Sequence, residues 1–142
     1  MPTHRLQVAR NSLARGVCQA PYSVSAIKLR WHLHWLPVRQ RIIYKVAIIT
    51  SKTTSAKTAA YLSDTIHNYY HPASTLRSAD KLLLTVPRMS LALSAKAFSV
   101  SVPSVWNSLS SNYRSAKLLS TYKRTLKTKL FDIAYSQHEH SS

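Results

Sequence analysis

Apolar residues recur at intervals of three and four along most of this chain, a spacing that places them on one face of an α-helix. The clearest stripe lies near the C-terminus and consists of Leu119, Tyr122, Leu126, Leu130 and Ile133. We therefore predict a mainly α fold, a small helical domain of about five to six helices with one short β-hairpin. We assign residues 1–137 to this single domain and residues 138–142 to a disordered tail.

Two helices are predicted in the N-terminal quarter. Leu6, Leu13 and Val17 lie at helical spacing and predict a first helix over residues 5–15 with an apolar face, ending at Gly16. Because Ser is a preferred N-cap residue, a Ser further along predicts the start of a second, shorter helix. This second helix is expected from Ser25 to Leu33.

The central helix is predicted to begin at Pro37, whose fixed φ suits a first helical turn, and to follow the aromatic anchor Trp35. Serine and threonine compete for backbone hydrogen bonds, so we expect it to end near Thr50, within residues 51–55. On a helical wheel its apolar face holds Val38, Ile42, Val46 and Ile49. A separate strip roughly 40° wide holds Arg41, Lys45 and Lys52.

The middle of the chain has weaker patterns. Residues 59–69 regain helical spacing and predict a helix, which ends before Pro72. A polar loop should follow. Residues 82–86 are then a continuous apolar run of strand length, and residues 89–93 alternate in part, which predicts a hairpin around Pro87.

One short helix is predicted ahead of the C-terminal stripe. Residues 95–102 place Phe98 and Val102 four residues apart, and Pro103 should open the short helix, which carries Trp106. Residues 110–115 are rich in Ser and predict a loop before the last helix.

Charge is the most unusual property of the composition. Twenty Lys and Arg against four acidic residues give a formal net charge of +16, and no acid precedes Asp64. Such an excess indicates an acidic partner, with RNA or DNA as the first candidate and an anionic membrane surface as the second. The longest apolar runs are far shorter than the roughly 20 residues that span a bilayer, so we expect no membrane span.

Catalytic chemistry lacks its usual parts in this sequence. Asp64, Asp80, Asp132 and Glu139 are each isolated, whereas two-metal catalysis and glycoside hydrolysis need grouped carboxylates. Cys18 has no flanking signal of activation. A single glycine also rules out a Gly-rich phosphate loop. We expect no enzyme activity, no cofactor and no small-molecule substrate.

Histidine spacing gives only a weak metal signal. His67 and His71 are four residues apart, but Pro72 argues against a helix that would bring them together. His32 and His34 would point away from each other on a helix. We predict no metal site.

The basic residues are the stronger functional signal, because they have few acids with which to form surface ion pairs. Contact with phosphates positions a nucleic acid without reading its sequence. The residues predicted to make such contacts are Arg39, Arg41, Lys45, Lys52, Arg77, Arg88, Lys123, Arg124, Lys127 and Lys129. Bases could stack on the tryptophans, but apolar neighbours favour a packing role. The predicted structural anchors are Trp35, Pro37, Trp106 and Phe98.

Several motifs occur in a fixed order along the chain. They are LQVARNSLAR from Leu6, LHWLPVRQRIIYK from Leu33, YLSD from Tyr61, LRSAD from Leu76, VPR from Val86, AFSVSVPSVWNSL from Ala97 and YKRTLKTKLF from Tyr122. In this order and spacing the chain resembles the C-terminal region of LINE-type, jockey-like reverse transcriptases of non-LTR retrotransposons, downstream of the polymerase core. The resemblance implies a segment that helps to hold template RNA and target DNA, with the polymerase and endonuclease residues in the rest of the parent protein.

Two other interpretations stay open. Arg5, Arg10 and Arg15, with no acid among them, also suit a mitochondrial presequence, which would make the chain a small basic ribosome-associated protein imported into mitochondria. A nonfunctional, decayed element fragment is the other, because Ala56 and Ala59 stand where the family commonly has a Gly and Pro turn. We favour the nucleus or cytoplasm, with the mitochondrion as the alternative.

Overall fold

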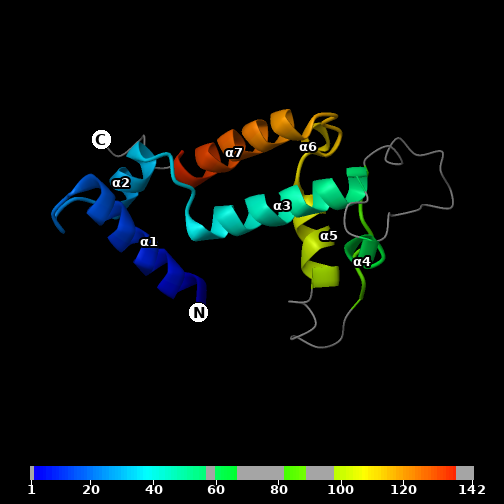
Figure 1. Ribbon diagram of the computed structural model, residues 1–142, viewed down its shortest axis with the longest axis horizontal. Helices are drawn as coiled ribbons and strands as arrows, with labels where there is room; N and C mark the ends of the chain where they lie inside the picture. The colour runs from blue at the N-terminus through cyan, green and yellow to red at the C-terminus, as the bar shows by residue number, and fades with distance from the viewer. Residues whose placement is uncertain (1, 57–59, 67–81, 89–97, 137–142) are drawn as a thin grey trace. The chain divides into compact units, whose positions relative to one another are not determined.

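A computed structural model describes residues 2–56, 60–66, 82–88 and 98–136 of the chain. These residues form seven helices and no strand, which confirms the predicted mainly α fold (Figure 1). In chain order the helices are α1 (Pro2–Cys18), α2 (Ala26–His32), α3 (Val38–Ala56), α4 (Ala60–Ser63), α5 (Phe98–Ser108), α6 (Ser111–Arg114) and α7 (Leu119–Tyr135).

The chain divides into two compact units. One contains residues 1–44 and 125–142, and the other contains residues 45–124. We call them the terminal unit and the middle unit and describe each by itself. The assignment of residues 1–137 to one domain stays a prediction, and the predicted tail, residues 138–142, lies outside the described residues.

In the terminal unit, α1 extends past the predicted end at Gly16, because the reversal of the chain is made by another residue. Gln19 has a φ of 50° and takes the left-handed conformation. Its amide donates to the carbonyl of Gly16 at 3.3 Å, and the amide of Ala20 donates to the carbonyl of Arg15 at 3.0 Å. These two bonds are the Schellman pattern that satisfies the last carbonyls of a helix.

The face of α1 that packs is not the predicted one. Leu6, Leu13 and Val17 are 56%, 60% and 59% exposed, so the predicted apolar face was wrong. The packed face is polar: the amide of Gln7 donates to Asn11 at 2.9 Å, and its carbonyl oxygen accepts from the amide of Val38 at 2.9 Å. Because these polar groups find partners, they can be placed against the other helices at little cost.

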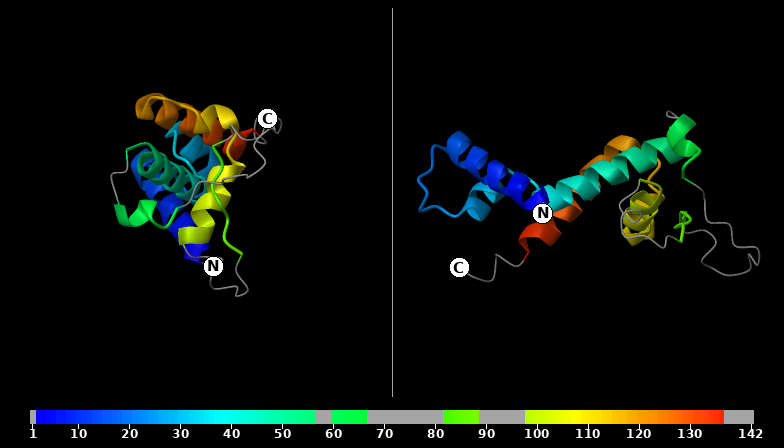
Figure 2. Two further views of the ribbon diagram at one scale, coloured as in Figure 1. Left: turned by 90° about the vertical axis from the view of Figure 1, so that its right-hand side faces the viewer. Right: turned by 90° about the horizontal axis from the view of Figure 1, so that it is seen from below.

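Helix α2 lies beside α1 and has the bounds that Ser25 and the apolar spacing predicted, within one residue (Figures 1 and 2). Helix α3 begins directly after Pro37, whose carbonyl accepts the first helical bond from Arg41 at 2.9 Å. Gln7 binds the free amide at the start of α3, so a side chain of α1 caps α3.

Helix α3 does not end at its Ser- and Thr-rich segment, as predicted, but continues to Ala56. The hydroxyls of Thr50, Thr53 and Thr54 each donate to the carbonyl four residues earlier, at 2.8, 2.9 and 2.9 Å. The hydroxyls therefore bond within the helix and need no partner that would interrupt it.

The buried positions of α3 also differ from the wheel. Ile42 and Ile49 are 45% and 40% exposed, while Ala47 and Ile48 are buried. The predicted apolar face is therefore correct at Val38, which is 7% exposed, and wrong at the two exposed isoleucines.

In the middle unit, α5 and the segment 82–88 are joined by side chains. Asn107 donates to the carbonyl of Leu84 at 2.8 Å and accepts from its amide at 2.9 Å. The indole of Trp106 donates to the carbonyl of Leu82 at 2.8 Å. These bonds explain why segment 82–88 runs beside α5 (Figures 1 and 2).

The segment itself is not the predicted first strand of a hairpin. Leu84 is a single bridge residue in an otherwise irregular stretch, and its backbone amide and carbonyl both bond to the side chain of Asn107. The predicted second strand, residues 89–93, lies outside the described residues.

Three other helix predictions for the middle unit need correction. The helix predicted over residues 59–69 is described only as α4, since the chain turns after Ser63, whose hydroxyl donates to the carbonyl of Ala60 at 2.8 Å. Pro103 does not open a helix and lies inside α5. The predicted loop over residues 110–115 contains α6, in which the buried Arg114 donates to the carbonyl of Asn107, near the end of α5, and to that of Leu109, just after it.

Helix α7 matches its prediction best. Tyr122, Leu126 and Leu130 are at most 5% exposed, whereas Ile133 is 55% exposed and was wrongly placed in the stripe. The buried side chain near the end of α7 is Tyr135, 3% exposed.

Candidate nucleic-acid interface

The predicted phosphate-contacting residues are mostly on the surface of two helices. On α3, Arg39, Arg41, Lys45 and Lys52 are all exposed. Their helix contains no Asp or Glu, so no carboxylate one turn away can neutralise them. We call Arg41, Lys45 and Lys52 the α3 strip.

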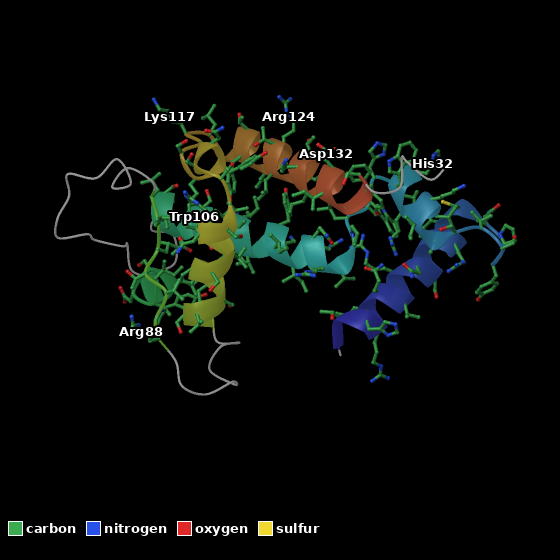
Figure 3. The ribbon with its side chains drawn as sticks, turned by 180° about the vertical axis from the view of Figure 1, so that it is seen from behind. His32, Arg88, Trp106, Lys117, Arg124 and Asp132 are labelled. Atoms are coloured by element: carbon green, nitrogen blue, oxygen red, sulfur yellow. The ribbon has the colours of Figure 1, made fainter. Side chains whose placement is uncertain are left out.

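Helix α7 carries a second set. Arg124, Lys127 and Lys129 are exposed, whereas Lys123 is half-buried and less available than predicted. Arg88 is exposed in the segment beside α5, and its side chain projects outward, as does that of Arg124 (Figure 3). Arg77 lies outside the described residues.

The predicted anchors hold backbone segments in place. The carbonyl of Trp35 accepts a hydrogen bond of 2.6 Å from the phenol of Tyr135. Trp106 is only 4% exposed, and the centre of its indole ring lies 6.3 Å from the centre of the Tyr122 phenol ring. A base therefore cannot stack on Trp106. Figure 3 shows Trp106 on α5. Phe98 and Pro37 are both half-buried.

An arginine cluster that the sequence did not predict lies in the terminal unit. The guanidinium group of Arg10 lies 5.2 Å from the centre of the Trp35 ring. Burial lowers the pKa of Arg10, and the positive charges of Arg41 and Arg30 lower it further, while Tyr135 raises it. Arg10 therefore interacts electrostatically with Arg30 and with Arg41, and we call these three residues, which come from three helices, the arginine cluster.

The arginine cluster contains hydrogen-bond donors without acceptors. Arg30 is 7% exposed and donates to Asn11 through Nη1, but its Nε has no partner among the described residues. Nη1 of Arg10 is also buried, and no described residue accepts from it. Arg10 shares the α1 face that packs with Gln7 and Ala14, and the apolar spacing of the sequence did not reveal this face.

The histidines are the candidate metal ligands in the sequence. His32 and His34 are exposed, and the ring of His34 stacks on Phe131 at 5.6 Å. Across residues 2–56, 60–66, 82–88 and 98–136, no three His, Cys, Asp or Glu side chains are grouped as metal ligands. His67 and His71 lie outside these ranges.

No helix in the described part of the chain has the length and apolarity needed to cross a bilayer.

Comparisons with known proteins did not identify a family: no protein-family model, curated protein or solved structure matches this chain. The resemblance to LINE-type reverse transcriptases therefore stays a prediction. The residues of the chain itself supply the functional argument.

Proposed function

We propose that this chain is a noncatalytic segment that binds the backbone of RNA and DNA and is related to the C-terminal region of LINE-type reverse transcriptases. In the parent protein, the rest of the reverse transcriptase would act on the nucleic acid that this segment holds. The observation that carries the proposal is the α3 strip, because its three cations are exposed on a helix without a single acid.

The chemistry of the α3 strip suits phosphates. Lys and Arg bind phosphate oxygens and release the counterions condensed on the nucleic acid, which favours binding at low salt. Arg41, Lys45 and Lys52 recur every four or seven residues, so they lie along one side of α3. Such contacts hold a nucleic acid without selecting its sequence.

Binding as a function of salt concentration tests the proposal. Fluorescence anisotropy of labelled single-stranded RNA and duplex DNA of several sequences should give micromolar or weaker affinity, with little sequence preference. Contact with about 4 to 8 phosphates predicts a slope of log K against log salt of several units. Affinity that does not change with salt, or no binding at low salt, would contradict the proposal.

A second candidate function rests on α1. Its arginines accompany leucines and a valine that are exposed rather than packed, as in the basic amphipathic helix of a mitochondrial presequence. On this alternative the chain is a small basic protein imported into mitochondria. A fluorescent fusion that enters mitochondria and loses its N-terminal segment would favour import, and an unprocessed nuclear or cytoplasmic fusion would favour nucleic-acid binding.

A further inference from the structure

The arginine cluster carries positive charge that the described part of the chain does not neutralise. Within the described residues, the ionisable groups that act on Arg10 are Arg41, Tyr135 and Arg30, and no carboxylate is among them. Like charges held together by three helices repel one another, and an anion in their midst would relieve that repulsion.

The unsatisfied donors indicate the shape of that anion. Arg30 Nε and Arg10 Nη1 are buried atoms without acceptors in the described part of the chain, and each costs free energy while it stays unpaired. Guanidinium groups match the oxygens of phosphate in paired hydrogen bonds. A tetrahedral oxyanion therefore supplies both the missing charge and the missing acceptors.

Exposure within the cluster distinguishes two kinds of phosphate. Arg41 is exposed, Arg10 is half-buried and Arg30 is 7% exposed, so the cluster contains one surface arginine and one buried arginine. A phosphodiester inside a strand has a sugar on both sides and carries one negative charge, whereas a terminal phosphate has one free side. The terminal phosphate also has three free oxygens and a charge of about −1.5 to −2 at neutral pH.

We propose that Arg10, Arg30 and Arg41 bind the terminal phosphate of a nucleic-acid strand. This inference rests on the proposed function, because Arg41 belongs both to the α3 strip and to the arginine cluster. It adds a strand end to the backbone contacts, through Arg10 and Arg30, which the sequence analysis did not assign to phosphate contact.

The test compares one short single-stranded RNA with a 5′-phosphate, with a 3′-phosphate and with hydroxyls at both ends. A hydroxyl-ended RNA one nucleotide longer controls for the added charge. At least one phosphorylated RNA should bind about tenfold more tightly than both hydroxyl-ended RNAs, the size of effect expected from charge-assisted hydrogen bonds. Equal affinity for all four overturns this inference alone, whereas no binding of any RNA overturns the proposed function as well.

Substitutions assign the preference to the cluster. The double variant Arg10→Gln, Arg30→Gln should abolish the preference for a terminal phosphate. The control Arg5→Gln, Lys28→Gln removes two exposed charges from the same helices and should keep the ratio between the affinities for phosphorylated and hydroxyl-ended RNA. Arg41→Gln changes an exposed side chain and should reduce the ratio without affecting folding, as circular dichroism would verify. An undiminished ratio in Arg41→Gln and in any folded Arg10 and Arg30 variant would overturn the assignment.

Discussion

The phenol of Tyr135 donates a hydrogen bond of 2.6 Å to the backbone carbonyl of Trp35, 100 residues earlier in the chain. The Tyr135 ring lies 4.6 Å from Phe131, which stacks on His34. An aromatic group at the end of α7 thus holds the segment that leads into α3. This contact orders the residues immediately before the proposed phosphate-binding helix.

Replacing Tyr135 with Phe should lower the free energy of unfolding by about 1 kcal/mol, since the ring stays and one hydrogen bond is lost. Urea denaturation measures the change. The control Tyr22→Phe removes a phenol from a side chain that is 88% exposed and should change stability by less than about 0.5 kcal/mol. Equal effects of the two substitutions would contradict a specific role for the Tyr135 bond.

Replacing Asn107 with Ala should free segment 82–88 from α5. Both bonds between Asn107 and the backbone of Leu84 disappear, and we expect a loss of about 2 kcal/mol because two partly buried backbone groups lose their partners. Hydrogen exchange should become faster at the amide of Leu84. Asn112→Ala, at an exposed position on α6, is the control, and similar exchange at Leu84 in both variants would show that Asn107 does not hold the segment.

Periodicity predicted the fold best where apolar side chains are the ones that pack. This condition holds on α7, where Tyr122 and Leu126 are buried as expected. It fails on α1, because Gln7 and Asn11 satisfy each other and face the neighbouring helices. A hydrophobicity pattern does not record whether a polar group will find a partner elsewhere in the chain, so it predicted the helix and misplaced its face.

The candidate site also has a part that the sequence predicts and a part that depends on how the helices pack. The exposure of Arg41 and Lys45 follows from their place on one amphipathic helix, which the sequence reveals. The proximity of Arg10 to Arg30 and Arg41 depends on how three helices pack, and it could not be read from spacing. The predicted ends of helices failed where a hydroxyl or an arginine side chain bonds to the backbone, as at Thr50 and Arg114.

Alkaline pH should destabilise the chain through Tyr122. Burial raises the pKa of Tyr122 from 10.0 to about 12, and its phenol donates to the carbonyl of Ala47 at 3.4 Å. Between these two pH values the folded state keeps a proton that the unfolded state has released, so the free energy of unfolding falls as pH rises. The full loss is on the order of 2 to 3 kcal/mol and is absent below pH 10.

Denaturation of Tyr122→Phe at a series of pH values isolates this effect from the titration of the other tyrosines. Near neutral pH the variant should differ from the unmodified chain by about 1 kcal/mol or less, since the ring stays and the bond to Ala47 is long. As the pH passes through 10 to 12, the variant should lose less stability than the unmodified chain. Parallel pH profiles would show that Tyr122 ionises as readily in the folded state as in the unfolded one.

The α3 strip should account for a large share of the salt dependence of nucleic-acid binding. Each lost phosphate contact lowers the slope of log K against log salt by about 0.9 on duplex DNA, so changing Arg41, Lys45 and Lys52 to Gln should lower it by about 2 to 3. Circular dichroism should show unchanged helicity, since all three side chains are exposed. The matched control removes three other exposed charges, with Arg5→Gln, Lys28→Gln and Lys117→Gln. Because these residues lie outside the α3 strip, the control should lower the slope by less than about 1, the value of a single contact. If both triple variants lower it equally, the chain binds through its overall charge and α3 has no special role.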